Sequence, residues 1–294
     1  MVEPSEWQPW RELLEQRSKD RSPWLLLPAE VHRSSEHRDV SYGALHRHAL
    51  RIAEGLRARG VEPGDRVVVL ADNGVESALT LVGALVSGAI VVPVAPPEML
   101  LSFERWQHGL RAVCADCEPR LIVGQKGSID GLSVDGTPVA SFADVSRGPR
   151  APLSPEAARS PGSPALIQYT SGTTSRPRGA TLTHANLRHN IWNIGRAFDA
   201  RPGEVGVCWL PLFHDMGLIG CLLFATVWGM SAVRVLITGT CRSPKKPLYG
   251  VKAAVSGSSA ISSISPIRLT SATRTRRWGI RALRRSAATA FRQG

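Results

Sequence analysis

The chain has 294 residues, of which 43% are hydrophobic and 20% charged, and this composition is typical of a globular protein with about two domains. Its formal net charge of +12 suggests nucleic-acid binding, but the charge is unevenly spread. The last 79 residues carry 13 of the 36 Lys and Arg side chains and none of the 24 Asp and Glu side chains. Residues 1–215 are therefore close to neutral, so the body of the chain lacks the charge of a nucleic-acid-binding protein.

The N-terminus and the cysteines favour a cytoplasmic protein. Residues 1–7 lack the basic and apolar regions of a secretory signal. The five cysteines are odd in number and scattered, which does not indicate a disulfide framework. Cys114 and Cys117 form a single CxxC without a second pair or a nearby histidine, so we interpret them as an ordinary pair at a helix end and predict no metal site.

Apolar runs and helical patterns alternate along the first 123 residues. Residues 5–30 predict an apolar helix and strand, and Leu45 to Leu56 repeat at helical spacing. Short strands are expected at 66–70, 90–94 and 119–123, with helices at 73–86 and 101–116 between them. Strand, helix and strand within about 30 residues make a βαβ unit. The predicted fold class is α/β, with a mostly parallel sheet and helices on both faces.

The stretch from Gln168 to Gly179 is rich in hydroxyls, glycine and arginine. It follows a predicted strand at 164–169 and precedes a helix that begins near Thr183. Glycine lets the backbone approach an anion, and backbone N–H groups and hydroxyls donate to phosphate oxygens. The spacing differs from that of a P-loop, so we predict a polyphosphate-binding loop of another kind.

This stretch, Tyr169-Thr-Ser-Gly-Thr-Thr-Ser-Arg-Pro-Arg-Gly179, resembles the phosphate-binding signature of the adenylate-forming (AMP-binding) superfamily. The order of segments from Val40 to Pro97 resembles the opening of that superfamily, so the resemblance covers roughly residues 5–230. Two positions depart from the signature, with Ser175 where glycine is usual and Arg178 where lysine is usual. The resemblance implies part of the N-terminal domain of an adenylate-forming enzyme.

A second motif, Pro211-Leu-Phe-His-Asp-Met-Gly-Leu218, is similar to the fourth core motif of these enzymes, in the form typical of fatty-acyl-AMP ligases. The resemblance implies that His214 lies beside the acyl-adenylate site as a catalytic residue. The alternatives are a structural loop histidine at His214 and a helix cap at Asp215.

The resemblance also implies a reaction, in which ATP with Mg²⁺ activates a fatty acid to an acyl-adenylate. The acyl group then passes to an acceptor, either the thiol of an acyl carrier protein or polyketide synthase, or coenzyme A. The residues that would hold the phosphates are Thr170, Ser171, Gly172, Thr173, Thr174, Arg178 and Gly179.

The end of the chain has a different composition. Residues 216–233 are uncharged, and we interpret them as a buried helix and a strand rather than a membrane span. We expect residues 1–237 to form the N-terminal part of an AMP-binding domain, and residues 238–294 to be a basic tail that is disordered or out of frame. The family's downstream carboxylates cannot occur after Asp215, so we expect a truncated, incomplete or inactive ligase. The alternatives are a non-catalytic remnant or binding module and, more distantly, a basic nucleic-acid-binding protein.

Overall fold

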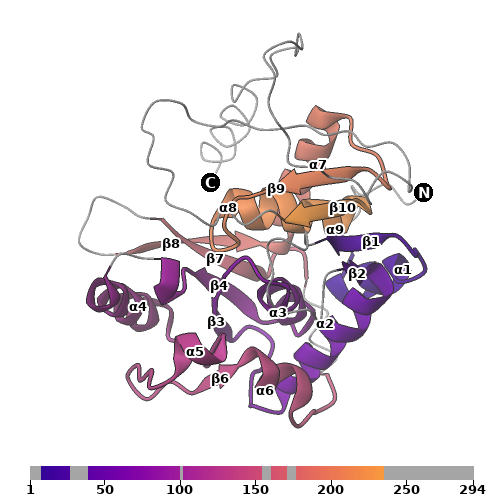
Figure 1. The fold of residues 1–294 in the computed structure, drawn as a ribbon. Coiled ribbons are helices and arrows are strands. Elements are labelled where there is room, and N and C mark those ends of the chain that lie inside the picture. The colour runs from indigo at the N-terminus through magenta and orange to yellow at the C-terminus, as the bar shows by residue number, and fades with distance from the viewer. Residues whose placement is uncertain (1–7, 27–38, 100–101, 154–159, 171–176, 235–294) are drawn as a thin grey trace, which may run out of the picture.

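A six-stranded sheet forms the centre of the protein, which is described here from a computed structural model (Figure 1). The structure describes residues 8–26, 39–99, 102–153, 160–170 and 177–234. The strand order is β6-β5-β3-β4-β7-β8, and every neighbouring pair is parallel except β7 and β8. Its strands are β3 (Arg66–Leu70), β4 (Ile90–Val94), β5 (Leu121–Gly124), β6 (Val139–Ser141), β7 (Pro164–Thr170) and β8 (Arg178–Thr183). The predicted α/β fold with a mostly parallel sheet is confirmed.

Helices cover both faces of this sheet (Figure 1). Val67 and Val69 of β3 belong to a core shared with α2 (Tyr42–Arg57) and α3 (Val75–Val86). Val68 and Leu70 belong to a second core, shared with α4 (Phe103–Cys117). Since successive strand residues point to opposite faces, a strand that is buried on both sides must be apolar throughout. This requirement explains the run of β-branched residues in β3.

A second sheet, ordered β2-β1-β10-β9, contributes residues to the core that contains α2 and α3. Its strands are β1 (Pro23–Leu26), β2 (Asp39–Ser41), β9 (Val205–Cys208) and β10 (Ser231–Arg234). The Tyr42 hydroxyl contacts the carbonyl oxygens of Ala225 and Met230 at 2.8 Å each. Trp24 Nε1 donates to the Thr226 hydroxyl at 2.9 Å. These buried contacts join the first 60 residues to the segment just before β10.

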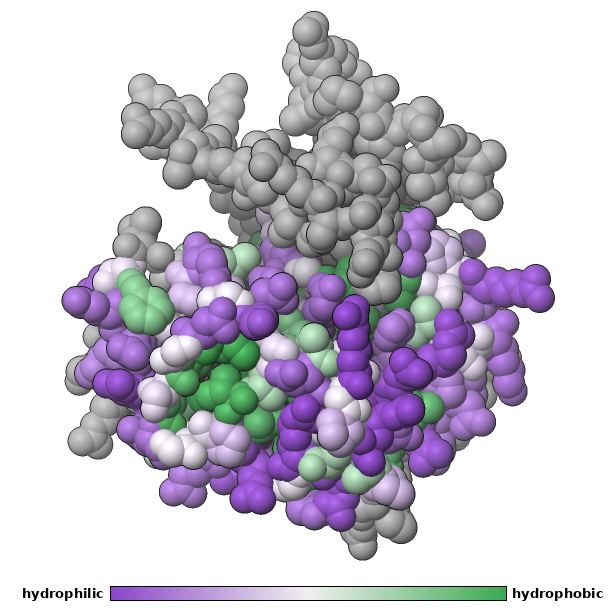
Figure 2. Space-filling view, turned by 60° about the horizontal axis from the view of Figure 1, so that its bottom comes forward, coloured by the Kyte–Doolittle hydropathy of each residue, from purple (hydrophilic) through white to green (hydrophobic). Residues whose placement is uncertain are grey.

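The remaining helices complete the layers. They are α1 (Trp10–Arg17), α5 (Lys126–Ile129), α6 (Phe142–Arg147), α7 (His184–Phe198), α8 (Asp215–Gly217) and α9 (Phe224–Trp228), with a π-helix at Leu218–Leu223 between the last two. Figure 2 views the molecule from the side of α4, α5 and α6, which is mainly hydrophilic with one hydrophobic area.

Two expectations differ from the structure in detail. The predicted loop was to run from Thr170 to Gly179, but Arg178 and Gly179 belong to β8, which pairs antiparallel with β7. The uncharged run after Asp215 does contain helix followed by strand, as predicted, but a π-helix and two short helices make up its helical part. The described part of the chain holds no helix that is long and apolar enough to cross a membrane. Residues 238–294 lie outside the described residues, and their separation from residues 1–237 stays a prediction.

Candidate functional site

The first component of the site is the hairpin of β7 and β8, whose connection contains most of the predicted phosphate loop. Leu166 of β7 pairs with Val91 of β4 in parallel, so residue 171 follows the carboxyl end of a strand in the central sheet. Ligands of open α/β sheets bind at this end. Thr170 and Arg178 are Cα partners in the register of β7 and β8, and they close the ladder at the loop. Arg178 is exposed, so its guanidinium is accessible to an anion.

Gly179 has a packing role in this hairpin. It is the register partner of Tyr169, and an added Cβ would lie 2.6 Å from Ile167 Cγ2 and 3.0 Å from Tyr169 Cζ. A larger residue would therefore displace the tyrosine ring. The structure gives a steric reason for glycine at this position, and phosphate binding by Gly179 stays a prediction.

Two neighbouring side chains hold the end of β7 from opposite faces of the sheet. The Tyr169 hydroxyl donates to Asp116 Oδ2 of α4 at 2.5 Å. Burial and the contact with Asp116 both raise the pKa of Tyr169, so the hydroxyl keeps its proton. Gln168, one residue earlier, contacts the opposite side of the sheet through its amide.

The second component is the segment from Pro211 to Leu218, which follows β9. The His214 N–H donates to the Pro211 carbonyl at 3.1 Å, and the Leu218 N–H donates to the His214 carbonyl at 2.9 Å. Gly217 packs directly against the Pro211 carbonyl, which leaves no room for a Cβ there. These contacts form a compact turn that leads into α8 and the π-helix. π-Helices occur often at functional sites.

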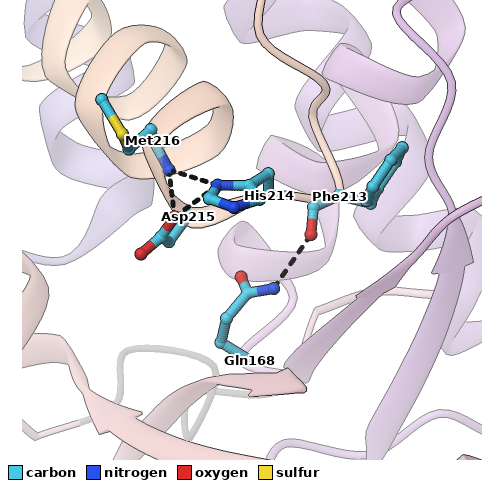
Figure 3. Close-up of polar contacts among 5 residues, drawn as sticks. All are labelled: Gln168, Phe213, His214, Asp215 and Met216. Atoms are coloured by element: carbon cyan, nitrogen blue, oxygen red, sulfur yellow. Dashed lines mark hydrogen bonds and ion pairs between the residues drawn. The ribbon is translucent and has the colours of Figure 1, made fainter. Parts of the chain in front are cut away.

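Side-chain amides connect this turn to the central sheet, and Figure 3 shows the contact made by Gln168. Gln168 Nε2 donates to the carbonyl oxygen of Phe213 at 2.9 Å. Asn73, in the connection after β3, accepts the Leu212 N–H at 3.1 Å through its buried Oδ1. The two contacts place the segment with His214 at the edge of the sheet where β7 ends.

His214 itself is exposed and lies next to Asp215 (Figure 3). His214 Nδ1 is 2.5 Å from Asp215 Oδ1. The Met216 N–H is 2.7 Å from Asp215 Oδ1 and 3.4 Å from His214 Nδ1, so the carboxylate is its better acceptor. We therefore assign the Nδ1 proton as donated to Asp215, which leaves Nε2 as the nitrogen that faces other partners. The alternative that Asp215 caps this helix is wrong, because α8 begins at Asp215 and its N-cap is His214; the backbone N–H that Asp215 accepts is that of the next residue, Met216.

The predicted residues fall into three groups. Thr170, Arg178 and Gly179 lie at the two ends of the hairpin connection, and His214 lies on the segment bonded to β7. Four others, Ser171, Gly172, Thr173 and Thr174, are outside the described residues. Across the described ranges, no group of three or more His, Cys, Asp and Glu side chains is arranged to hold a metal ion. The Cys114 and Cys117 thiols are buried and free.

Sequence reasoning assigned no role to Gln168, Asn73 or Asp116. A polar glutamine near the end of an otherwise apolar strand is a usable signal, because buried polar groups require partners. Asn73 lies three residues after the carboxyl end of β3, where side chains converge on the ligand edge of the sheet. Asp116 gave no such signal, since its partner Tyr169 is 53 residues away.

Comparison with known proteins gives one consistent result. Residues 26–252 match the AMP-binding enzyme family, which is well over half of the chain. The long-chain-fatty-acid–AMP ligase FadD32 of Mycobacterium marinum is 33% identical over 229 residues, covering 72% of this chain and 34% of that protein. The 4-hydroxyphenylalkanoate adenylyltransferase of the same species is 30% identical, covering 68% of this chain and 33% of that protein. The chain spans about a third of the length of these relatives.

The fold comparison agrees. The crystal structure of the fatty acyl-adenylate ligase from L. pneumophila, solved with acyl adenylate and pyrophosphate, superimposes with a TM-score of 0.67 at 25% identity. The superposition covers 81% of this chain and 41% of that one. The match of sequence and of fold shows that this chain belongs to the AMP-binding enzyme family, where its similarity is to the fatty-acyl-AMP ligases.

Proposed function

We propose that this chain provides the nucleotide-binding and acyl-binding edge of an ATP-dependent fatty-acyl-AMP ligase. In this reaction a carboxylate oxygen of the fatty acid attacks the α-phosphorus of ATP, the bond from that phosphorus to the bridging oxygen breaks, and pyrophosphate leaves. The observation that carries the proposal is the 2.9 Å contact between Gln168 and Phe213, because it joins the strand before the phosphate loop to the segment with His214.

The residues have separate roles in this proposal. The β- and γ-phosphates accept hydrogen bonds from the hydroxyls of Thr170, Ser171, Thr173 and Thr174. Gly172 and Gly179 allow close approach of the backbone. Arg178 is exposed at the hairpin end, where its planar guanidinium suits a bidentate contact with phosphate. Replacing lysine by arginine changes that geometry but keeps the charge.

His214 is proposed to border the acyl end of the site. Its Nδ1 faces Asp215, so Nε2 is the atom that would meet the carboxylate or the developing acyl-phosphate. The His214 side chain is exposed, so a substrate can reach it.

ATP fits the donor set of hydroxyls, backbone N–H groups and Arg178. Mg²⁺ has no comparable set in the described part of the chain, where no cluster of three potential ligands occurs. Mg²⁺ binds proteins through one or two carboxylates together with substrate phosphates and water, and it neutralises phosphate charge when it is bound.

The substrate and acceptor are proposed from the relatives. A fatty acid is the substrate that the relative from M. marinum names, and a hydroxyphenylalkanoate is the alternative named by the other. An acyl carrier protein or polyketide synthase is the proposed acceptor, with coenzyme A as the alternative. Pyrophosphate exchange into ATP, run separately with a long-chain fatty acid and with a 4-hydroxyphenylalkanoate, would distinguish the substrates.

Binding of ATP is measured by calorimetry on the wild type, Arg178→Ala and Thr173→Ala. Each substitution should weaken binding about tenfold or more, since a charge-assisted contact contributes about 1.5–3 kcal/mol. Arg111→Ala, an exposed arginine of α4, is the matched control and should leave binding unchanged. Equal affinities in all four proteins would contradict the proposed site. ATP binding without any exchange would instead favour a non-catalytic binding module.

A further inference from the structure

We infer that Gln168 is a positioning residue that couples the end of β7 to the segment carrying His214, so that a nucleotide bound beside this strand end fixes the histidine. The inference deepens the proposed function and depends on it for the identity of the ligand. The geometric part, that Gln168 holds the segment in place, stands on the described contacts alone.

Gln168 lies near the carboxyl end of β7. It lies two residues before Thr170, the last residue of β7, and its Nε2 contacts the carbonyl of the residue directly before His214. The two ends of this contact are 45 residues apart in the sequence. A side chain so placed transmits a shift at the end of β7 to the backbone of His214 through one hydrogen bond.

Asn73 makes a matching contact with the same segment. Its Oδ1 accepts the N–H of Leu212, and Gln168 Nε2 donates to the carbonyl of Phe213. The N–H before the Leu212–Phe213 peptide is thus held by the amide of Asn73, which follows β3. The carbonyl after that peptide is held by the amide of Gln168, which belongs to β7. Leu212 is fully buried, so this peptide is also fixed by packing. The segment therefore has little freedom while both amides are in place.

The other polar atom of the Gln168 amide is its oxygen, Oε1. Gln168 Oε1 is buried, and within the described residues it accepts no hydrogen bond. Buried acceptors are paired in the great majority of cases. The reversed amide orientation would set an oxygen against the Phe213 carbonyl, so the assignment of Nε2 to that contact is secure. A donor that arrives with the ligand would complete this amide and stabilise its contact with Phe213.

The end of β7 is itself held in place by side-chain contacts. Tyr169 is tied to Asp116 on the other face of the sheet, and its ring packs over Gly179. The end of β7 is thereby fixed from both sides, which keeps the Gln168 side chain aimed at one target. Coupling between two sites requires such a contiguous and ordered connection.

The test uses hydrogen exchange, measured on peptides that cover residues 211–218, in the full chain without ligand. Gln168→Met keeps the length of the side chain and removes its donor. Loss of one hydrogen bond of ordinary strength should speed exchange in this segment about fivefold. Gln125→Met replaces an exposed glutamine at the start of α5 and should leave exchange in the segment unchanged. Unchanged exchange in a folded Gln168→Met would overturn the inference.

A second variant protects the test against misfolding. Gln168→Glu keeps the shape and also removes the N–H donor, so it should accelerate exchange in the same segment. Exchange in β3 and β4 reports whether each variant has folded, because these strands are central in the sheet. The geometric claim is supported if at least one variant shows native exchange in β3 and β4 and faster exchange at 211–218. It is contradicted if exchange is native in β3, in β4 and at 211–218.

ATP supplies the test of coupling. In the wild type, saturating ATP should slow exchange at 211–218, and in Gln168→Met this slowing should be lost while ATP affinity changes less than twofold. A merely structural residue would alter the exchange without ligand and leave the ATP response intact. If ATP binds and the segment does not respond in the wild type, the coupling is wrong; if ATP does not bind at all, the proposed function fails and the measurement without ligand decides the role of Gln168.

Discussion

Gly217 lies directly against the carbonyl oxygen of Pro211, in a position where any Cβ would overlap that oxygen. The contact closes the turn that carries His214. Gly217→Ala should lower the free energy of unfolding by about 2 kcal/mol, since overpacking of a tight site costs about 1–3 kcal/mol. Denaturation by urea, followed by circular dichroism, measures the loss.

Gly220→Ala is the matched control for that substitution. It lies three residues further on, in the π-helix, and a Cβ there would meet no atom within 4 Å. Alanine should therefore be neutral or stabilise by about 0.5 kcal/mol, because glycine is unfavourable within helices. A smaller loss for Gly217→Ala than for Gly220→Ala would show that the close contact with Pro211 is unimportant.

Tyr42 joins helix α2 to the segment before β10 through one buried hydroxyl. Burial raises its pKa, so the hydroxyl stays protonated, and its single proton lies within reach of the carbonyls of both Ala225 and Met230. Tyr42→Phe should lower the free energy of unfolding by about 1–3 kcal/mol, the cost of leaving a buried polar group unsatisfied. Ser146→Ala, which removes an exposed hydroxyl contact to a backbone carbonyl, is the control and should change stability by less than about 0.5 kcal/mol. Equal effects of the two changes would argue against the buried contact.

The thiols of Cys114 and Cys117 should be unreactive in the folded protein. Burial raises the pKa of Cys114 to about 12 and that of Cys117 to about 11, so both remain thiols at pH 8. Iodoacetamide at pH 8 should modify them slowly in native protein and quickly in urea, since the thiolate is the nucleophile. Rapid modification of the native pair, read by mass spectrometry, would contradict their burial.

The same pKa shifts predict a change of stability with pH. The unfolded thiols ionise near pH 9, whereas the folded ones ionise only near pH 11 and 12. The folded state therefore binds more protons in this range, and its stability should fall as the pH rises from about 9 to about 12. Replacing both cysteines by alanine should flatten this part of the stability curve, although the variant will be less stable throughout.

His214 should affect the use of the fatty acid more than the use of ATP. In the pyrophosphate exchange assay, His214→Ala should lower kcat/KM for the fatty acid about tenfold, equivalent to one lost contact of about 1.4 kcal/mol, with KM for ATP unchanged. Asp215→Asn is the comparison, because an exposed ion pair contributes only about 0–1 kcal/mol and the amide oxygen can still accept the Met216 N–H. An equal loss in both variants would indicate that the pair acts only by shaping the helix start.

Much of the central sheet could be predicted from the sequence. The apolar run at 66–70 and the helix before residue 90 were identifiable because a parallel strand is buried on both faces and a crossover helix must follow it. The capped start at Thr183 was also readable, and the structure shows its full capping box with Asn186. In each case the signal lies within about 15 neighbouring residues.

The antiparallel pairing of β8 with β7 was not predicted. The segment from Arg178 to Thr183 contains no buried residue, and its only apolar side chains are Ala180 and Leu182, so it carries no apolar run. Its register is determined by contacts such as Tyr169 over Gly179, which exist only once the hairpin has formed. Strand pairing depends on such cross-strand contacts more than on intrinsic preference.

The sequence alone predicts phosphate chemistry, because a hydroxyl-rich and glycine-rich loop after a strand suits phosphate, and the motif from Pro211 to Leu218 adds a histidine. How the two motifs meet depends on the tertiary structure. Their connection depends on Gln168 and Phe213, 45 residues apart, and on Asn73 and Leu212, 139 residues apart. Local patterns follow from backbone preference and hydrophobic period, whereas a hydrogen bond between distant residues depends on the packing of the whole sheet and its helices, which no short stretch of sequence contains.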